Sequence, residues 1–185
     1  MKSESLKSIN GVTLIYPDLY PDCRGVFTEV FRLEWVKELY GEQLQVNCTH
    51  SGKGVVRGLH FHRFQTDIWF PSSGIFLAGL ADMRPDSPTF RGTVMLELNS
   101  SEPACLLIPP GVAHGYVTLT DATLLYLVNR YYDGSDEYGV AWDDPDLALD
   151  WGTDSPILSE RDRSNGNISS MSVDWLRNLF ADQTL

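Results

Sequence analysis

The sequence predicts an all-β protein of the sandwich or barrel kind. Between residues 11 and 132 it runs through short segments that are rich in β-branched and aromatic residues. Glycine, proline, asparagine, aspartate and serine separate these segments, and no helical periodicity lies between most of them. Such a pattern is typical of antiparallel sheets that pack on one another. The predicted strands are 11–17, 25–32, 43–51, 54–62, 66–72, 74–84, 91–99, 104–110, 115–120 and 123–132.

Two segments have the apolar spacing of short helices. Residues 33–42 are the first candidate. Residues 172–183 are the second, because Trp175, Leu176 and Leu179 recur on one face of a helix. Both are short compared with the strand region, so the sequence predicts peripheral helices on a β fold.

The remaining segments indicate no second domain. Residues 159–171 are polar and are predicted to form a loop. Prolines and acidic residues gather in 143–156, which we expect to run as an extended excursion over the β fold. Because no repeat, low-complexity tract or linker interrupts the chain, we expect one domain over residues 1–185.

The composition indicates a globular protein without affinity for polyanions. Hydrophobic residues make up 43% of the 185 residues, which is enough for a sizeable core. The net charge of -11 argues against a nucleic-acid or anionic-membrane partner, yet a few arginines can still surround a small anionic ligand. The chain shows no apolar run of about 18 residues and no signal-type stretch. With three scattered cysteines, this predicts free thiols in the cytoplasm.

Two of the four histidines lie close together in the stretch GVVRGLHFHRFQTD. Side chains alternate across a strand, so His60 and His62 point to one side while Leu59 and Phe61 point to the other. His60 can act as a base, or His60, His62 and Asp67 can hold a metal ion. The two uses exclude one another for His60, because a nitrogen bound to a metal accepts no proton. A plain surface pair of histidines is the third interpretation.

The spacing of these residues resembles the two sequence signatures of the cupin superfamily. Aspartate replaces the usual glutamate in the first signature, and Thr118 replaces a usual asparagine after the second. The resemblance implies a double-stranded β-helix, or jelly roll, with a few short peripheral helices. The matching residues are Gly54, His60, His62, Asp67 and Gly74 in the first signature, and Pro109, Gly111 and His114 in the second.

A narrower resemblance covers most of residues 22 to 162. Six blocks occur in the order found in the dTDP-4-dehydrorhamnose 3,5-epimerase family. This resemblance implies an enzyme that epimerises a nucleotide-linked 4-keto-6-deoxy sugar at C3, C5 or both, through an enolate, in deoxysugar or cell-surface polysaccharide biosynthesis. It also implies a homodimer and a mechanism that requires no cofactor. The blocks are 22–31, 45–61, 84–90, 108–127, 131–151 and 158–162.

The family resemblance assigns chemical roles to four residues. It implies that His60 is the base, that Asp162 holds the other nitrogen of His60, and that Tyr126 returns a proton from the opposite face of the sugar. It implies that Arg57 binds the diphosphate as a bidentate cation. These roles fit the reaction, because removing a proton beside a ketone needs a base, an acid and stabilisation of the enolate oxygen.

Other residues resemble the family's contacts with the nucleotide and the sugar. Arg24, Phe27 and Glu29 belong to the RGVFTE strand, where we expect the chain to cross to its partner subunit. Packing in the core or in a strand is the alternative for Phe27 and for the tyrosines. The other expected contacts are Gln45, Asn47, His114, Tyr132 and Arg161.

Three positions of the expected site depart from the family. Asp67 stands where the family has a lysine that stabilises the enolate, and His62 stands where a residue that binds no metal is common. Ala78 stands where the family has an aspartate that pairs with His114. Losing one oxyanion donor typically lowers the rate by a factor on the order of 10²–10³. A carboxylate at position 67 would also repel the enolate unless it is protonated or neutralised.

These departures leave a metal site open. A divalent transition metal such as Zn, Fe, Mn or Ni would stabilise an enolate as a Lewis acid. In the alternative, a short connection lets Asp67 pair with Arg63 or Arg57. The candidate ligands are His60, His62, Asp67 and His114.

Three functions therefore remain open at this point. We expect an epimerase of a nucleotide-linked sugar, most simply a dTDP-linked one, acting as a homodimer without nucleic-acid or membrane partners. A metal-dependent cupin enzyme on the same scaffold is the first alternative. A sugar-nucleotide-binding relative that has lost turnover is the second.

Overall fold

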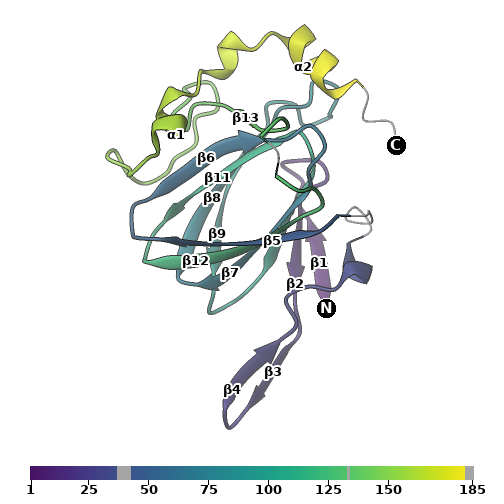
Figure 1. Ribbon diagram of the computed structural model, residues 1–185, viewed down its shortest axis with the longest axis vertical. Helices are drawn as coiled ribbons and strands as arrows, with labels where there is room; N and C mark the ends of the chain where they lie inside the picture. Colours follow the sequence, from purple (N-terminus) through teal and green to yellow (C-terminus); the bar gives the residue numbers. More distant parts are fainter. Residues whose placement is uncertain (37–42, 133, 182–185) are drawn as a thin grey trace.

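Two antiparallel sheets face each other in the computed structural model, which describes residues 1–36, 43–132 and 134–181 (Figure 1). Together they form the predicted cupin jelly roll. Across the described residues, the six-stranded sheet has the order β1 (Lys2–Ser5), β2 (Thr13–Tyr16), β10 (Cys105–Ile108), β7 (Asp67–Ser73), β12 (Ala122–Val128) and β5 (Gln45–Ser51). The five-stranded sheet has the order β13 (Tyr138–Gly139), β6 (Val56–Phe61), β11 (Val112–Thr118), β8 (Ile75–Asp82) and β9 (Thr93–Asn99).

Every predicted strand segment contains a strand, so the all-β prediction is confirmed. Besides the two-residue edge strand β13, the sequence pattern missed two short strands, β1 and β3. All four residues of strand β1 are polar and exposed, and the strand is held by its ladder with β2. Strand β3 (Leu19–Asp22) contains Pro21 and pairs with β4 (Gly25–Thr28) in a separate hairpin. Neither strand buries an apolar face, which is the signal that periodicity detects.

The five-stranded sheet is covered on both faces, and this arrangement positions His60. On the outer face, Leu59 and Phe61 of β6 pack with Trp151 and Ile168 of the C-terminal segment. The inner face of the sheet turns toward the six-stranded sheet. Alternation along β6 therefore directs His60 between the sheets, as predicted.

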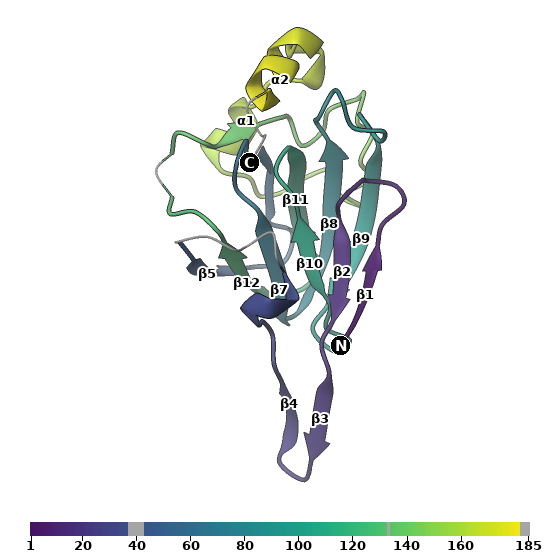
Figure 2. The same ribbon diagram turned by 90° about the vertical axis from the view of Figure 1, so that its right-hand side faces the viewer.

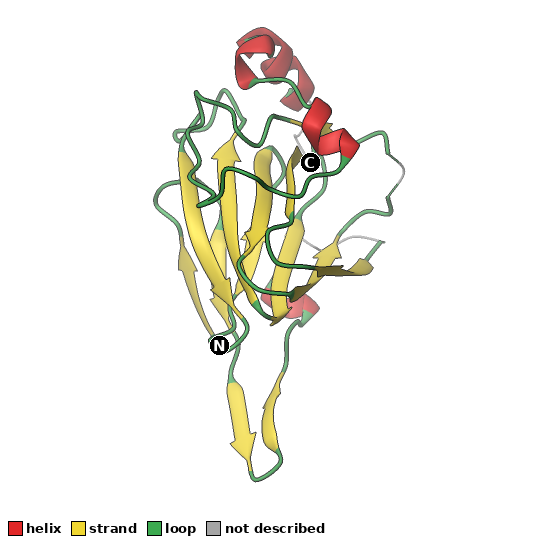
Figure 3. Cartoon of the chain, turned by 90° about the vertical axis from the view of Figure 1, so that its left-hand side faces the viewer, coloured by secondary structure: helices red, strands yellow, loops and turns green. Residues whose placement is uncertain are grey.

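The C-terminal segment crosses the outside of the five-stranded sheet (Figure 3). The acidic stretch within it contributes two buried apolar side chains, Leu147 and Trp151, together with the buried Asp144, as expected for an excursion over the fold. The Trp151 indole N–H donates to the carbonyl oxygen of Trp142 at 2.7 Å. This layer makes the outer face of β6 part of the core.

Short helices end this segment: α1 (Glu160–Ser164), η3 (Ile168–Ser170) and α2 (Val173–Phe180). The helix predicted from residue 172 is confirmed, with Leu176 buried. The loop predicted over 159–171 is wrong, because the Ser159 hydroxyl accepts the N–H of Asp162 and caps a helical turn.

The other predicted helix is confirmed only at its start. Residues Leu33–Trp35 form a 3-10 turn, η1. Positions 37–42 of that prediction lie outside the described residues. No helix within the described part of the chain is both long and apolar enough to cross a bilayer.

Candidate active site

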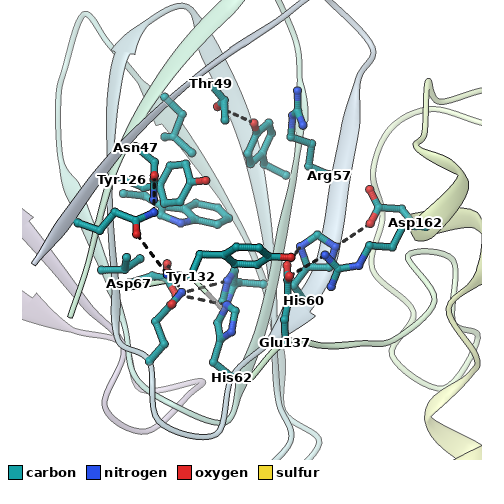
Figure 4. A pocket seen from close by; sticks show the side chains of 18 of the residues that line it. Asn47, Thr49, Arg57, His60, His62, Asp67, Tyr126, Tyr132, Glu137 and Asp162 are labelled. Carbon is teal, nitrogen blue, oxygen red and sulfur yellow. Dashed lines mark hydrogen bonds and ion pairs between the residues drawn. The ribbon is translucent and has the colours of Figure 1, made fainter. Parts of the chain in front are cut away.

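A cavity of about 510 Å³ opens between the two sheets. Strands β5, β7 and β12 form one wall, and β6 and β11 form the other, while residues around α1 close one side (Figure 4). Ligand pockets of this size and mixed lining are typical of small-molecule sites. The predicted site residues that line it are Gln45, Asn47, Arg57, His60, His62, Asp67, His114, Tyr126, Tyr132, Arg161 and Asp162.

Three predicted site residues lie away from this cavity. Arg24 sits at the tip of the β3–β4 hairpin, which projects from the rest of the chain (Figure 2). Its guanidinium pairs with Asp22 at 2.5 Å. Phe27 on β4 is 65% exposed, and Glu29 pairs with Arg32 at 2.6 Å. A single chain therefore does not bring these residues to the other site residues.

His60 is held by Asp162 across 102 residues of sequence. The Nε2 atom of His60 lies 2.6 Å from the Asp162 carboxylate, so Nε2 carries the proton and donates it. The Nδ1 atom then carries the lone pair. Burial alone would raise the pKa of Asp162, but hydrogen bonds from His60, Ser159 and the Gly58 backbone lower it. Asp162 thus stays ionised and fixes the tautomer that a base needs.

Glu137 is a charged residue of the site that the sequence did not predict. Its carboxylate lies 3.8 Å from His60 Nδ1 and 2.7 Å from the Arg161 guanidinium. Burial opposes the charge of Glu137, but the hydrogen bond from Arg161 and the proximity of His60 lower its pKa. The only sequence signal was its place in the acidic block 131–151, and no local pattern connects it with β6.

Tyr126 faces the cavity from the sheet opposite His60 (Figure 4). Burial, and then the charge of Asp67, raise the pKa of Tyr126, so its phenol keeps a proton to donate. Arg57 lies on the His60 side, where its Nε donates to the Ser51 hydroxyl at 3.2 Å. The cavity therefore has an acceptor of protons on one wall and a donor on the other.

The polar end of the cavity is organised by β5. Gln45 Nε2 donates to the Asn47 side-chain oxygen at 2.8 Å, and the Gln45 side-chain oxygen accepts the backbone N–H of Tyr132 at 3.2 Å. Alternation along β5 turns Gln45 and Asn47 into the cavity. Tyr132 is 67% exposed at this end, so the packing role considered for it is wrong.

His62, Asp67 and His114 form a buried cluster in the same cavity. The two Nε2 atoms lie 3.8 Å and 3.7 Å from Asp67 Oδ2, and the ligand atoms of all three residues lie within 4.8 Å of one another. The sequence hypothesis included His60 in this set, whereas the structure pairs His60 with Asp162. Gln65 Nε2 also donates to the Asp67 carboxylate at 3.2 Å.

Packing takes the place of the family aspartate beside His114. Ala78 is fully buried in the core and offers no polar partner. Instead, the His114 ring meets Trp69 edge-on at 5.3 Å, and its Nδ1 donates to the Val112 carbonyl oxygen. Burial, followed by the neighbouring His62, lowers the pKa of His114 to about 3, so this imidazole is neutral.

Comparisons with known proteins show which protein family this chain matches. The family described as dTDP-4-dehydrorhamnose 3,5-epimerase matches residues 7–170. The enzyme of that name from Sinorhizobium fredii is 35% identical over 176 residues, which cover 91% of this chain and 90% of the relative.

Solved structures agree. The epimerase RmlC from Legionella pneumophila, in complex with dTDP-4-keto-L-rhamnose, superposes with a TM-score of 0.84 at 30% identity and covers 94% of this chain and 96% of its own. The 3'-monoepimerase ChmJ from Streptomyces bikiniensis, in complex with dTDP-quinovose, gives a TM-score of 0.85 at 29% identity, covering 95% and 94%. This chain therefore belongs to the dTDP-4-dehydrorhamnose 3,5-epimerase family and is an isomerase of the epimerase kind.

Proposed function

We propose that this chain exchanges the protons at C3, C5 or both of a dTDP-linked 4-keto-6-deoxy sugar. The observation that carries the proposal is the His60–Asp162 pair on one sheet, facing Tyr126 on the other sheet across a single cavity. A base and an acid on opposite faces of a sugar ring are what an inversion requires. Relatives solved with dTDP-sugars support the choice of nucleotide.

The reaction uses the acidity of carbons beside a ketone. His60 Nδ1 takes a proton from C3 or C5, and the electron pair of the broken C–H bond moves onto the C4 oxygen as an enolate. Tyr126 then gives a proton to the same carbon from the opposite face, and the C4 carbonyl reforms. Asp162 remains ionised throughout and stabilises the imidazolium that forms on His60.

Neighbouring charges support these steps. Glu137 lies near His60 Nδ1, so its negative charge faces the imidazolium that forms during the reaction, while Arg161 pairs with the other oxygen of Glu137. We assign Arg57, Gln45 and Asn47 to the nucleotide diphosphate end of the substrate, because a guanidinium and two amides provide donors for an anionic ligand. Organic cofactors have no part in these proton transfers.

We also propose that the active unit is a homodimer. The β3–β4 hairpin exposes Tyr20, Val26 and Phe27 at 51%, 62% and 65%. An apolar hairpin of this kind is typical of a contact with another chain. Crossing to a second copy would bring Arg24, Phe27 and Glu29 to that copy's cavity, which explains why one chain leaves them apart. Light scattering during size exclusion tests this, and a monomer in solution would contradict it.

Deuterium incorporation tests the epimerase proposal. The protein is incubated in D₂O with a dTDP-4-keto-6-deoxyhexose, and proton NMR follows the signals of H3 and H5 separately. Loss of either signal is expected, and the pattern tells a monoepimerase from an enzyme that acts at both carbons. If neither signal exchanges while dTDP still binds, the chain is a non-catalytic relative.

A further inference from the structure

We propose that His62, Asp67 and His114 form a three-ligand site for a divalent transition metal, with Zn²⁺ as the simplest candidate. The site lies in the wall of the cavity that holds His60 and Tyr126. The inference deepens the proposed function, because it provides the electrophile for the enolate. Binding of the metal can nevertheless be tested without any sugar substrate.

The spacing of the ligand atoms fits an ion better than it fits direct hydrogen bonds. An N–H···O hydrogen bond brings the two heavy atoms to roughly 2.7–3.2 Å. Two ligands that each lie about 2.1 Å from one tetrahedral ion are roughly 3.4 Å apart. The two Nε2 atoms lie 3.8 Å and 3.7 Å from Asp67 Oδ2. Small side-chain movements would therefore close the three residues on an ion.

The backbone sets both histidines in the tautomer that binds metals. His62 Nδ1 contacts the carbonyl oxygen of Asp136 at 2.5 Å, and His114 Nδ1 contacts that of Val112 at 2.9 Å. A carbonyl oxygen can only accept, so each Nδ1 carries the proton and each Nε2 is left with a lone pair. Hydrogen bonds of this kind orient histidine ligands in protein metal sites.

Two lone pairs thus point toward a carboxylate, and all three groups are shielded from water. The side chains of His62, Asp67 and His114 are only 10%, 3% and 8% exposed. Electron pairs arranged in this way repel one another unless a cation lies between them. Neutral imidazoles with one carboxylate are a donor set that suits Zn²⁺ and its neighbours, and three protein ligands leave a position open.

The charge balance connects this site with the reaction. Asp67 alone would place a negative charge in the cavity where an enolate forms. A divalent ion changes the charge of the cluster from -1 to +1, which stabilises an enolate oxygen as a Lewis acid does. His60 is not needed as a metal ligand. Its Nε2 is hydrogen-bonded to Asp162, and its Nδ1 stays available as a base. One cavity can therefore hold both a metal ion and a free base.

Metal binding by the untagged chain tests the proposal directly. The protein is stripped with a chelator, and ZnCl₂ and CoCl₂ are titrated by calorimetry, with the visible absorption of Co²⁺ as a second readout. We expect one ion per chain, a tetrahedral or five-coordinate Co²⁺ spectrum, and a higher melting temperature with metal. Stoichiometric binding with the weak absorption of octahedral Co²⁺ would overturn the assignment, as would no stoichiometric binding.

Ligand variants localise the site. Asp67→Asn and His62→Asn should each weaken Zn²⁺ binding more than about 100-fold, because even loss of an outer partner of a ligand costs 10–100-fold. His50→Asn is the matched control, since His50 is an exposed histidine on β5 that contacts Thr123. Melting curves in chelator show whether each variant folds, and His62→Asn remains usable if Asp67→Asn does not.

The outcomes separate this inference from the proposed function. Equal Zn²⁺ affinity in the wild type and both variants would overturn the metal site, even if deuterium exchange proceeds. Stoichiometric, Asp67-dependent binding supports the site, even if the sugars tested exchange no deuterium. Exchange that is unchanged by chelation, in a chain that binds no metal, would mean that a proton occupies the cluster instead.

Discussion

Two arrangements of histidine and carboxylate share one cavity, and they differ in where the imidazole proton lies. At Asp162 the carboxylate accepts the Nε2 proton of His60 at 2.6 Å, and the pKa of Asp162 is lowered. At Asp67 two Nε2 atoms stand 3.7 Å and 3.8 Å away, and burial raises the pKa of Asp67. In each histidine, one ring nitrogen is hydrogen-bonded to the surrounding protein. Which nitrogen this is decides whether the histidine can serve as a base or as a metal ligand.

The largest effect on deuterium exchange should come from replacing His60, the histidine that pairs with Asp162. His60→Asn removes the only nitrogen that we assign to proton abstraction, so deuterium exchange should fall by about 10²–10⁴-fold, the usual contribution of a general base. Zn²⁺ affinity should stay within a few-fold, because His60 is not among the proposed ligands. A large loss of metal binding in this variant would place His60 in the cluster after all.

A smaller loss of rate should follow when the support of His60 is weakened. Asp162→Asn keeps the size of the side chain but removes the charge that stabilises the imidazolium. We expect a drop in kcat that is smaller than that of His60→Asn, with little change in KM, because the effect is confined to the transition state. Asp174→Asn, on the exposed face of α2, is the control. A change in KM alone would argue that Asp162 is only structural.

The two aspartates should influence acid stability with opposite signs in metal-free protein. The folded-state pKa of Asp162 is lowered, so its stabilisation is present above its unfolded pKa and is lost as pH falls through the folded value. The folded-state pKa of Asp67 is raised, so its stabilisation is present below its unfolded pKa and is lost as pH rises through the folded value.

Urea unfolding across pH measures this difference. The cost of Asp162→Asn should shrink in acid, and the cost of Asp67→Asn should shrink toward neutral pH. Each residue can change the free energy of unfolding by at most about 1.4 kcal/mol per pH unit. Parallel curves for the two variants would show that the aspartates have similar surroundings, which would remove the contrast between the two arrangements.

The smallest effect is expected at Glu137. Its distance of 3.8 Å from His60 Nδ1 is too long for a hydrogen bond, so it acts on His60 through charge alone. Arg161 lies 2.7 Å from Glu137 and neutralises part of its charge, so we expect an interaction of about 1 kcal/mol, and Glu137→Gln should slow exchange about fivefold. Single-turnover measurements would detect this change, and Zn²⁺ binding should not respond. A loss comparable to that of His60→Asn would make Glu137 the base.

Most structural features that depend on residues close together in the sequence were predicted correctly. Alternation along β6 placed His60 on the inside and Leu59 and Phe61 on the outside, and the family blocks identified the epimerase fold. The polar edge strand β1 was missed, because backbone pairing with β2 and not side-chain burial forms it. Helix α1 was missed because its start depends on a single capping residue, Ser159, and not on an apolar pattern.

The site was predictable by residue but not by contact. His62, Asp67 and His114 were candidates from their spacing, yet their separation from His60 depends on which backbone carbonyls accept their Nδ1 protons. The first carbonyl belongs to Asp136, which lies 74 residues from His62 in the sequence. The second belongs to Val112, two residues before His114. The contact of Glu137 with His60 and Arg161 likewise joins three separate parts of the chain.

The helix cap at Ser159 has a consequence for the order of folding during protein synthesis. In the sequence, Asp162 follows all the described strands of both sheets. During synthesis on the ribosome the sheets can therefore assemble before the tautomer of His60 is fixed. The tautomer of His60 that we assign to proton abstraction is therefore held by Asp162 only after the segment that contains α1 has docked over β6.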